Sequence, residues 1–234
     1  MKKLSKNWAL WEIIFLLTSI LTISICFFIS PEKSVLSFIS SICGITTVFF
    51  LAKGLFFAPI TDIIYNCLYA AVSIVSLYYG EAIIYIFVMM PISISSLITW
   101  FKNKNKDEST VKVNKIKGKE WGFLSIACVA ITIGFYFLLK VLNTSQLFVS
   151  TISIITSVIG AYLLLRRSSY YAIAFILNDI ILIVLWGLTT LTNGLMYLPT
   201  TLSFIVFLIN DTYGFIRWKK EEKKLIKEQE NKDI

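Results

Sequence analysis

Histidine is absent from this 234-residue chain. Its absence removes the commonest metal ligand and the commonest general acid–base side chain. The four cysteines stand alone in apolar stretches without a C-x-x-C pair, which favours small hydrophobic residues over metal or redox groups. No G-x-x-x-x-G-K-[ST] loop and no nucleophile with an activating base is evident. We therefore expect no enzyme, no metal, no cofactor and no ATP-driven motor.

Charge is also scarce, since only 15% of the residues are charged while 57% are hydrophobic. Soluble domains carry roughly 25% charged residues. Together with a mean hydropathy of +0.77, this composition indicates an integral membrane protein. The first apolar run, Trp8 to Ile29, lacks an A-x-A-like cleavage site, so we expect it to remain as a helix.

Eight apolar runs are long enough to span a bilayer, which takes about 20 helical residues. The expected fold class is therefore an all-α polytopic membrane protein. The expected spans are 8–29, 35–57, 59–79, 82–101, 121–142, 147–165, 171–191 and 195–217.

The chain has a net charge of +8, and its basic residues lie almost entirely on one side of the expected membrane. With these spans, all of the 22 basic residues except Lys33 and Lys140 fall on one side of the bilayer. This is the positive-inside bias of a bundle with an even number of spans, which predicts that both termini lie in the cytoplasm. The expected location is the plasma membrane. The bias also makes nucleic acid an unexpected partner, because the basic residues follow the membrane topology.

An approximate internal repeat follows the spans. Gly44, Lys53, Asn66 and Trp100 have counterparts about 112 to 118 residues later, in the same order. Because corresponding helices lie four places apart in the series, we expect two parallel three-helix units, as in SWEET-type carriers. The expected segments are an N-terminal helix (1–34), repeat 1 (35–101), a basic cytoplasmic linker (102–120), a connecting helix (121–146), repeat 2 (147–218) and a charged tail (219–234).

The span 171–191 contains a carboxylate and an indole in otherwise apolar sequence. Asp179 and Trp186 are seven residues apart and therefore share a helix face, with Asn178 beside them. An Asp facing lipid costs about 2.5–3.5 kcal/mol on insertion scales, so an intramembrane Asp indicates a pathway or ligand residue.

Two other helices carry polar residues at matching spacing. Asn66 and Tyr69 share one face with Asp62, and Asn210 lies three residues before Tyr213. Each Asn alone fits an interhelical hydrogen bond, but the set favours a ligand cavity between the two units. The predicted substrate-binding residues are Asn66, Tyr69, Asn178, Asp179, Trp186, Asn210 and Tyr213.

These residues resemble the PnuC family of vitamin-precursor carriers, whose best-known members move nicotinamide riboside. The resemblance is carried by Asn66-Cys67-Leu68-Tyr69-Ala70, Leu77-Tyr78-Tyr79-Gly80-Glu81, Arg166-Arg167 with Asp179, and Asn210-Asp211-Thr212-Tyr213-Gly214 with Trp218. It implies a 3+1+3 helical core, a homotrimer, facilitated diffusion of a nucleoside, and trapping of that nucleoside by a cytosolic kinase. By position it points to Asn66, Tyr69, Asp179, Trp186 and Asn210 as cavity residues.

Three alternatives remain open at this point. The same fold suits a carrier of another vitamin, such as thiamine or riboflavin, of a deoxyribonucleoside, or of a sugar. A proton-coupled carrier would use Asp179 as a titrating group. A membrane assembly or signalling subunit would use its buried polar residues only to join helices.

Overall fold

The computed structural model describes residues 8–105, 109–144 and 146–230. Within these ranges, eight helices are long and apolar enough to cross a membrane, which confirms the predicted all-α polytopic class. The expectations for residues 1–7, for residues 106–108 of the linker and for the last four residues of the tail lie outside the described residues. The elements are α2 (Leu10–Ile29), α3 (Val35–Ala52), α4 (Ala58–Val75), α5 (Tyr79–Ile84), η1 (Tyr85–Met89), α6 (Met90–Lys102), α7 (Gly118–Val141), α8 (Leu147–Leu165), α9 (Tyr171–Asn193), η2 (Leu195–Tyr197) and α10 (Leu198–Glu230).

Several helix ends differ from the predicted spans for local reasons. Helix α3 stops at Ala52, not at residue 57, because Gly54 takes a positive φ of 65°. Helix α10 continues to Glu230, past the predicted residue 217. The ion pairs Lys219–Glu222 and Lys224–Glu221, each three residues apart, support this extension.

The fourth crossing contains a π-helical turn, η1, between α5 and α6. Pro91 follows this turn and lacks the N–H that a regular helix would pair with the carbonyl of Phe87. The irregular turn lies beside the buried side chains of Tyr85 and Met89, both of which line the central cavity described below.

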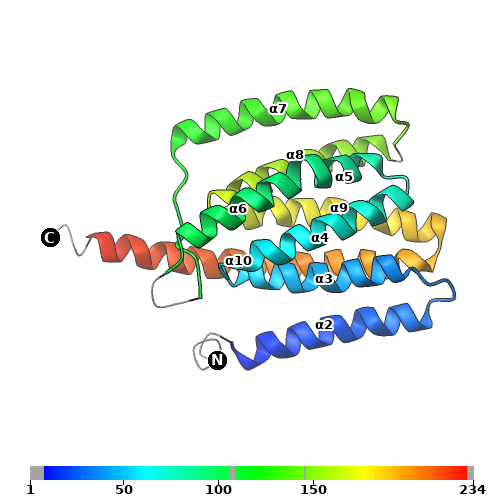
Figure 1. The fold of residues 1–234 in the computed structure, drawn as a ribbon, viewed down its shortest axis with the longest axis horizontal. Coiled ribbons are helices and arrows are strands. Elements are labelled where there is room, and N and C mark those ends of the chain that lie inside the picture. The colour runs from blue at the N-terminus through cyan, green and yellow to red at the C-terminus, as the bar shows by residue number, and fades with distance from the viewer. Residues whose placement is uncertain (1–7, 106–108, 145, 231–234) are drawn as a thin grey trace.

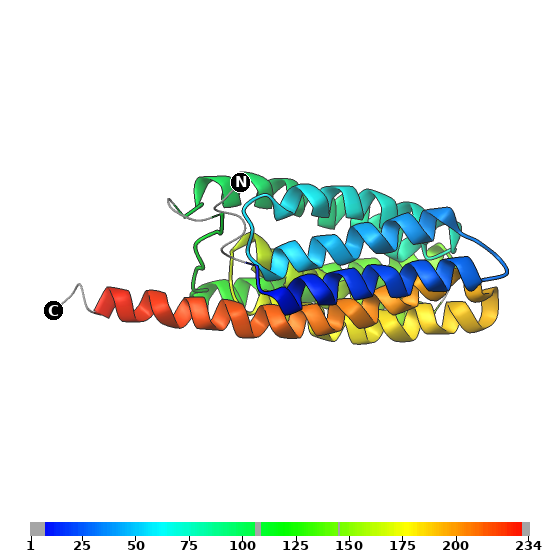
Figure 2. The same ribbon diagram turned by 90° about the horizontal axis from the view of Figure 1, so that it is seen from below.

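The long helices lie roughly side by side along one axis (Figures 1 and 2). Helices α3, α4, α6, α8, α9 and α10 pack together. Helix α2 flanks this bundle against α3 and α10, and α7 flanks the opposite side against α8. Both flanking helices present large apolar side chains outward, including Leu17 and Phe28 of α2 and Phe123 and Phe137 of α7. Such faces suit lipid or another apolar partner.

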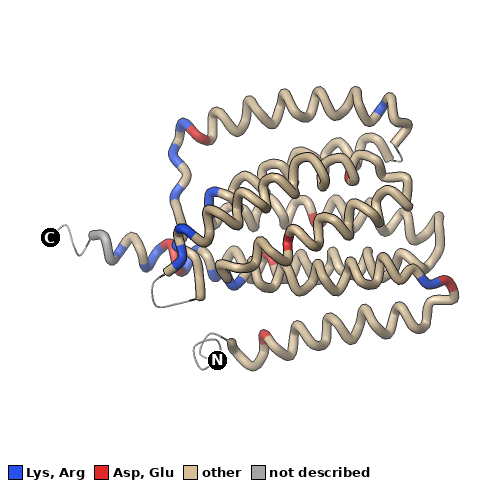
Figure 3. The backbone as a smooth tube through the Cα atoms, viewed as in Figure 1, with Lys and Arg blue, Asp and Glu red and all other residues tan. Residues whose placement is uncertain are grey.

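Basic residues gather at the end of the bundle where α10 projects, whereas acidic residues also occur partway along it (Figure 3). We call this end the basic end; it includes Lys53, Arg166 and Arg217. The first described turn of α2 and the last turn of α10 both lie there (Figure 1).

Two indoles at the basic end connect the two predicted units reciprocally. Trp100 of α6 donates its Nε1–H to the carbonyl of Leu164 in α8 at 3.2 Å. Trp218 of α10 donates its Nε1–H to the carbonyl of Leu51 in α3, also at 3.2 Å. The two indole rings are 5.7 Å apart. Each predicted unit thus donates one indole hydrogen bond to the other.

The linker runs across the basic ends of both predicted units. The Val111 N–H donates to the carbonyl of Gly54, and the Asn114 N–H donates to the carbonyl of Arg167, both at 2.9 Å. Gly54 and Arg167 both have positive φ and each follows the first helix of a predicted unit. The linker is therefore held to the helix ends by backbone hydrogen bonds.

Candidate functional site

A small cavity of about 40 Å³ lies between α3, α4, η1, α8, α9 and α10. Its lining includes three carboxyl groups, those of Asp62, Asp179 and Asp211. Among the residues that the structure describes, no Lys or Arg lines this cavity. The other lining residues are Thr47, Val48, Leu51, Tyr65, Asn66, Tyr85, Met89, Leu164, Tyr171, Phe175, Asn178, Phe204 and Phe207. We call it the central cavity.

Two of these carboxyl groups are neighbours. Asp179 in α9 and Asp211 in α10 both line the cavity and interact electrostatically. Two buried carboxylates in one site repel each other when both are ionised, so such a pair holds a proton or accepts a cation. The Oδ2 atom of Asp179 has no hydrogen-bond partner among the described residues. The pair therefore keeps an acceptor for a ligand.

The third carboxyl group belongs to a chain of polar contacts between α4 and α6. Asn66 donates its Nδ2–H to Ser93 Oγ at 2.9 Å, and Ser93 donates its hydroxyl to Asp62 at 2.5 Å. This chain leaves Asn66 Oδ1 buried without a partner in the described part of the chain. On the facing unit, the Asn178 side chain accepts from Thr156 at 2.8 Å and from Ser157 at 3.1 Å. Both asparagines are thus held in fixed orientations.

An aromatic cluster adjoins the central cavity. Trp186 donates its Nε1–H to the hydroxyl of Tyr69 at 2.7 Å, and both side chains are buried. The Tyr69 ring lies 4.3 Å from Tyr85 and 5.7 Å from Phe204, two residues that line the cavity. Tyr78, whose ring lies 5.4 Å from Trp186, packs on the far side of the indole. The cluster forms one wall between the cavity and the end opposite the basic end.

The predicted binding residues fall into three groups. Asn66, Asn178 and Asp179 line the central cavity. Tyr69 and Trp186 contact each other in the aromatic cluster. Tyr69 and Trp186 are not part of the cavity lining, and neither are the remaining two. Asn210 is buried, with no partner for its Nδ2 among the described residues, and Tyr213 lies at the basic end.

The cavity residues that the sequence did not predict include Asp62, Tyr85 and Asp211. Helical spacing carries a signal for two of them. Asp62 lies four residues before Asn66, and Asp211 lies four residues after Phe207, so each shares a face with another lining residue. Tyr85 lies in the π-helical turn, so regular helical spacing does not predict which face its side chain takes.

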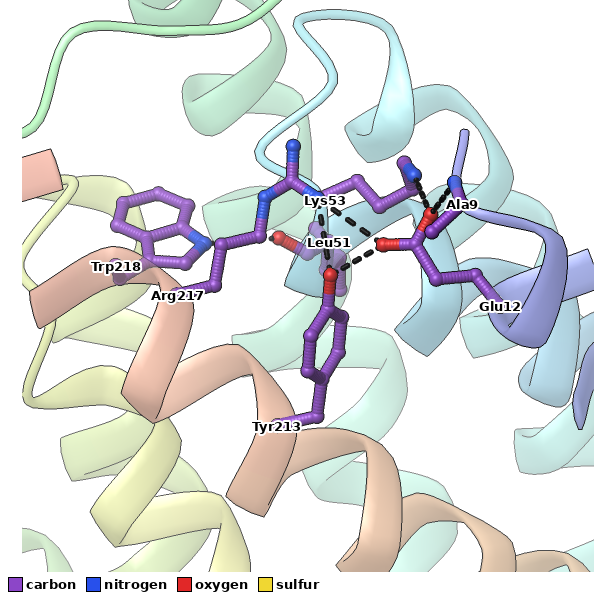
Figure 4. A network of polar contacts seen from close by, with 7 residues as sticks. All are labelled: Ala9, Glu12, Leu51, Lys53, Tyr213, Arg217 and Trp218. Carbon is purple, nitrogen blue, oxygen red and sulfur yellow. Dashed lines mark hydrogen bonds and ion pairs between the residues drawn. The ribbon is translucent and has the colours of Figure 1, made fainter. Parts of the chain in front are cut away.

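Tyr213 belongs to a separate ionic network at the basic end, drawn in Figure 4. Glu12 of α2 accepts hydrogen bonds from Lys53, from Tyr213 and from Nη1 of Arg217, the last at 3.2 Å. The Lys53 side chain is fully buried and lies 4.6 Å from the Trp8 ring centre. Burial lowers the pKa of Lys53, while its hydrogen bond to Glu12 opposes that change. The network joins α2 to the α3–α4 turn and to α10.

Comparison with known proteins places this architecture in context. The family model described as "Nicotinamide mononucleotide transporter" matches residues 34–220. The curated nicotinamide riboside transporter PnuC of Neisseria mucosa is 26% identical over 223 residues, which cover 94% of this chain and 84% of that protein. The crystal structure titled as that of the vitamin B3 transporter PnuC aligns with a TM-score of 0.82 and 24% identity, over 96% of this chain and 98% of the other. At that identity, the structural likeness shows a shared fold.

Proposed function

Because the chain belongs to the nicotinamide mononucleotide transporter family, we propose that this membrane transporter moves nicotinamide riboside, or a similar nucleoside, into the cell by facilitated diffusion. Assignment to a transporter family agrees with the expectation that the chain is not an enzyme. The finer points of substrate, direction and energetics rest on the central cavity.

The observation that carries the proposal is the charge of the cavity lining. Asp62, Asp179 and Asp211 face one buried space without a lysine or arginine in the described lining. Buried carboxylates need a proton, a cation or several donors to remain inside a membrane protein. The nicotinamide ring of the riboside is an N-substituted pyridinium and carries a permanent positive charge. The cavity therefore favours a cation and disfavours a phosphate ester.

The neighbouring groups suit the two ends of such a molecule. Electron-rich faces of Trp186 and the adjacent tyrosines attract a cationic ring. Asn66 Oδ1 and Asp179 Oδ2 are acceptors without a partner in the described structure, and ribose hydroxyls are donors. Asn66, Tyr69, Asn178, Asp179 and Trp186 therefore remain our proposed substrate-binding residues, with Asp211 added.

The present cavity does not hold a nucleoside. Its volume of about 40 Å³ is far below the roughly 300–1,000 Å³ of ligand pockets. Substrate entry therefore requires the aromatic cluster at one end, or the Trp100–Trp218 pair at the other, to move. Alternation between these two barriers would give access from each side in turn.

We further propose that the basic end faces the cytoplasm of a plasma-membrane protein. The positive-inside bias supports this orientation, and it places the ends of α2 and α10 on the cytoplasmic side. The residue ranges 35–101 and 147–218 are our proposed parallel units, and a homotrimer remains an expectation from the family resemblance. A cytosolic kinase would trap the riboside, since the acidic cavity disfavours its phosphate ester.

Uptake into proteoliposomes tests the proposal. With no membrane potential and no pH gradient, labelled nicotinamide riboside should enter only until its concentrations inside and outside are equal. Competition should be strong for nicotinamide riboside and weak for neutral riboflavin, deoxyribonucleosides and sugars. Thiamine also carries a positive ring, so stronger competition by thiamine would reassign the substrate. Absence of transport for every nucleoside and vitamin would favour an assembly or signalling subunit.

One observation favours a second candidate, a proton-coupled carrier. Asp179 and Asp211 line one buried space, where two ionised carboxylates would repel each other. A proton held by this pair would be displaced by a bound cation. Coupling predicts uphill accumulation when a pH gradient alone is imposed across the liposome membrane.

A further inference from the structure

A second cavity opens at the basic end, and its volume of about 240 Å³ is much larger than that of the central cavity. It lies between three segments that are far apart in the sequence. The α3–α4 turn contributes Lys53 and Gly54, the linker contributes residues 105 and 110–113, and α10 contributes Arg217 and Trp218 with the turn that follows. We call it the basic cavity.

The basic cavity has the opposite charge to the central cavity. Four basic side chains line it, those of Lys53, Lys112, Arg217 and Lys224, against one acidic side chain, Glu221. Glu221 pairs with Lys224 at 2.6 Å, and Glu12 lies behind the lining, where it binds Lys53 and Arg217. Even with both acids counted, the cluster keeps two positive charges.

We propose that the basic cavity binds a phosphate-bearing anion. Lys112 of the linker and Arg217 and Lys224 of α10 line it, while the buried ammonium of Lys53 binds Glu12 behind the lining. Charge-assisted hydrogen bonds from Arg and Lys are the usual means of holding phosphate. The Asn105 amide and the Thr110 hydroxyl add polar groups to the same lining. The phosphate is that of a soluble phosphate ester or of an anionic lipid headgroup, since both reach a basic pocket at the membrane surface.

The basic cavity lies next to the central cavity, so an anion bound there is expected to affect transport. Trp218 lines the basic cavity and donates to the carbonyl of Leu51, a residue that lines the central cavity. Its ring also lies 5.0 Å from that of Tyr171, which lines the central cavity too. Trp218 is thus the partition between the two cavities. An anion that binds both the linker and α10 is expected to hold this partition closed. This effect on transport rests on the proposed function, whereas the phosphate-binding site does not depend on it.

The binding test uses the full-length protein in neutral phosphatidylcholine nanodiscs. Ribose 5-phosphate and inorganic phosphate are titrated by calorimetry, with ribose as the control that lacks the phosphate. The double variant Lys112→Gln/Lys224→Gln should bind ribose 5-phosphate about tenfold more weakly or worse, because it loses two charged donors. Both lysines are solvent-exposed, so the variant is expected to fold.

The matched control is Lys117→Gln/Lys223→Gln, which removes the same charge from exposed residues outside the basic cavity. Its affinity for ribose 5-phosphate should change less than twofold. Equal weakening in both double variants, or equal binding of ribose and ribose 5-phosphate, would overturn the proposal. Nanodiscs with added phosphatidylglycerol distinguish the sources: unchanged affinity assigns the site to a soluble ester, and competitive loss assigns it to a headgroup.

The consequence for transport has its own readout. With ribose 5-phosphate on both sides of the liposome membrane, the initial uptake rate of nicotinamide riboside should fall at least twofold in the wild type. The rate in Lys112→Gln/Lys224→Gln should not change. Failure of the transport proposal would appear as absent uptake in every sample, while phosphate binding by calorimetry would persist.

Discussion

The surroundings of Asp179 determine which ligand charge it accepts. Its carboxyl group faces a cavity that also contains Asp62 and Asp211, and it keeps Oδ2 without a partner in the described residues. When a neutral ligand is bound, only protons can neutralise the negative charge of these carboxyl groups. A bound cation neutralises that charge directly, so the charge of the ligand should affect affinity more than its shape does.

We expect Asp179→Asn to weaken binding of nicotinamide riboside by tenfold or more, because hydrogen bonds to charged groups contribute about 1.5–3 kcal/mol. The amide has nearly the same shape as the carboxyl group and removes one of the cavity's acids, so the variant should remain folded. Calorimetry against nicotinamide riboside and its uncharged dihydro form measures the effect. The wild type should prefer the cation and the variant should lose most of that preference; an unchanged preference would remove Asp179 from the site.

The sequence predicted part of this site because some signals are local. An acid or an amide within an apolar run is visible without a structure, which is how Asn66, Asn178 and Asp179 were found. The partner of Asp179 was not found, because Asp211 approaches it only through the packing of α10 on α9. Spacing predicted Tyr213 as a cavity residue, but its hydroxyl donates a hydrogen bond to Glu12 at the basic end.

At the scale of helices, spans were easier to predict than ends. Hydrophobic length identifies a crossing, and all eight predicted crossings are helices in the structure. Ends depend on single residues, as the positive φ of Gly54 ends α3 early and ion pairs extend α10. The sequence also did not predict how α2 docks. A glutamate near a helix end, such as Glu12, is usually exposed to solvent, but here it pairs with the buried Lys53.

The Glu12 network should determine how firmly α2 docks. Glu12→Ala leaves Lys53 buried without its carboxylate, and loss of one partner from a buried ion pair costs about 3–5 kcal/mol. We expect a clear fall in the melting temperature of the purified protein, measured by thermal shift in detergent. The control is Glu221→Ala, which breaks an exposed pair with Lys224 and should change the melting temperature little. Equal shifts would contradict a special role for Glu12.

The contact between α3 and α10 depends on Gly44. A Cβ at this position would lie 2.5 Å from Phe207 Cζ and 2.7 Å from Tyr65 Cε2, so both rings must move. These rings line the central cavity. Gly44→Ala is therefore expected to lower affinity for nicotinamide riboside at least severalfold, as measured by calorimetry.

The matched control for Gly44→Ala is Gly134→Ala in α7, where an added Cβ meets no atom within 4 Å. This change should leave affinity unchanged, and it should stabilise the helix by up to about 1 kcal/mol because alanine has the higher helix propensity. If both variants bound like the wild type, the close contact at Gly44 would have no bearing on the cavity.

At the scale of the whole molecule, the two cavities differ in charge. The charged residues in the described lining of the central cavity are acids, whereas four of the five charged residues that line the basic cavity are bases. If import follows the proposed direction, a cation that leaves the first cavity passes the second. Movement of the cation alone carries net charge across the membrane, whereas exchange for the proton of the Asp179–Asp211 pair carries none.

This difference makes the membrane potential a decisive variable. One elementary charge gains about 2.3 kcal/mol per 100 mV, which corresponds to roughly 50-fold accumulation at equilibrium. If the transporter moves the cation without coupling, liposomes with a potassium diffusion potential of 100 mV, negative inside, should concentrate labelled nicotinamide riboside by about that factor. The uncharged dihydro form should not accumulate. Proton exchange predicts the reverse pattern, with no response to potential and accumulation under a pH gradient, and Asp179→Asn should abolish that response.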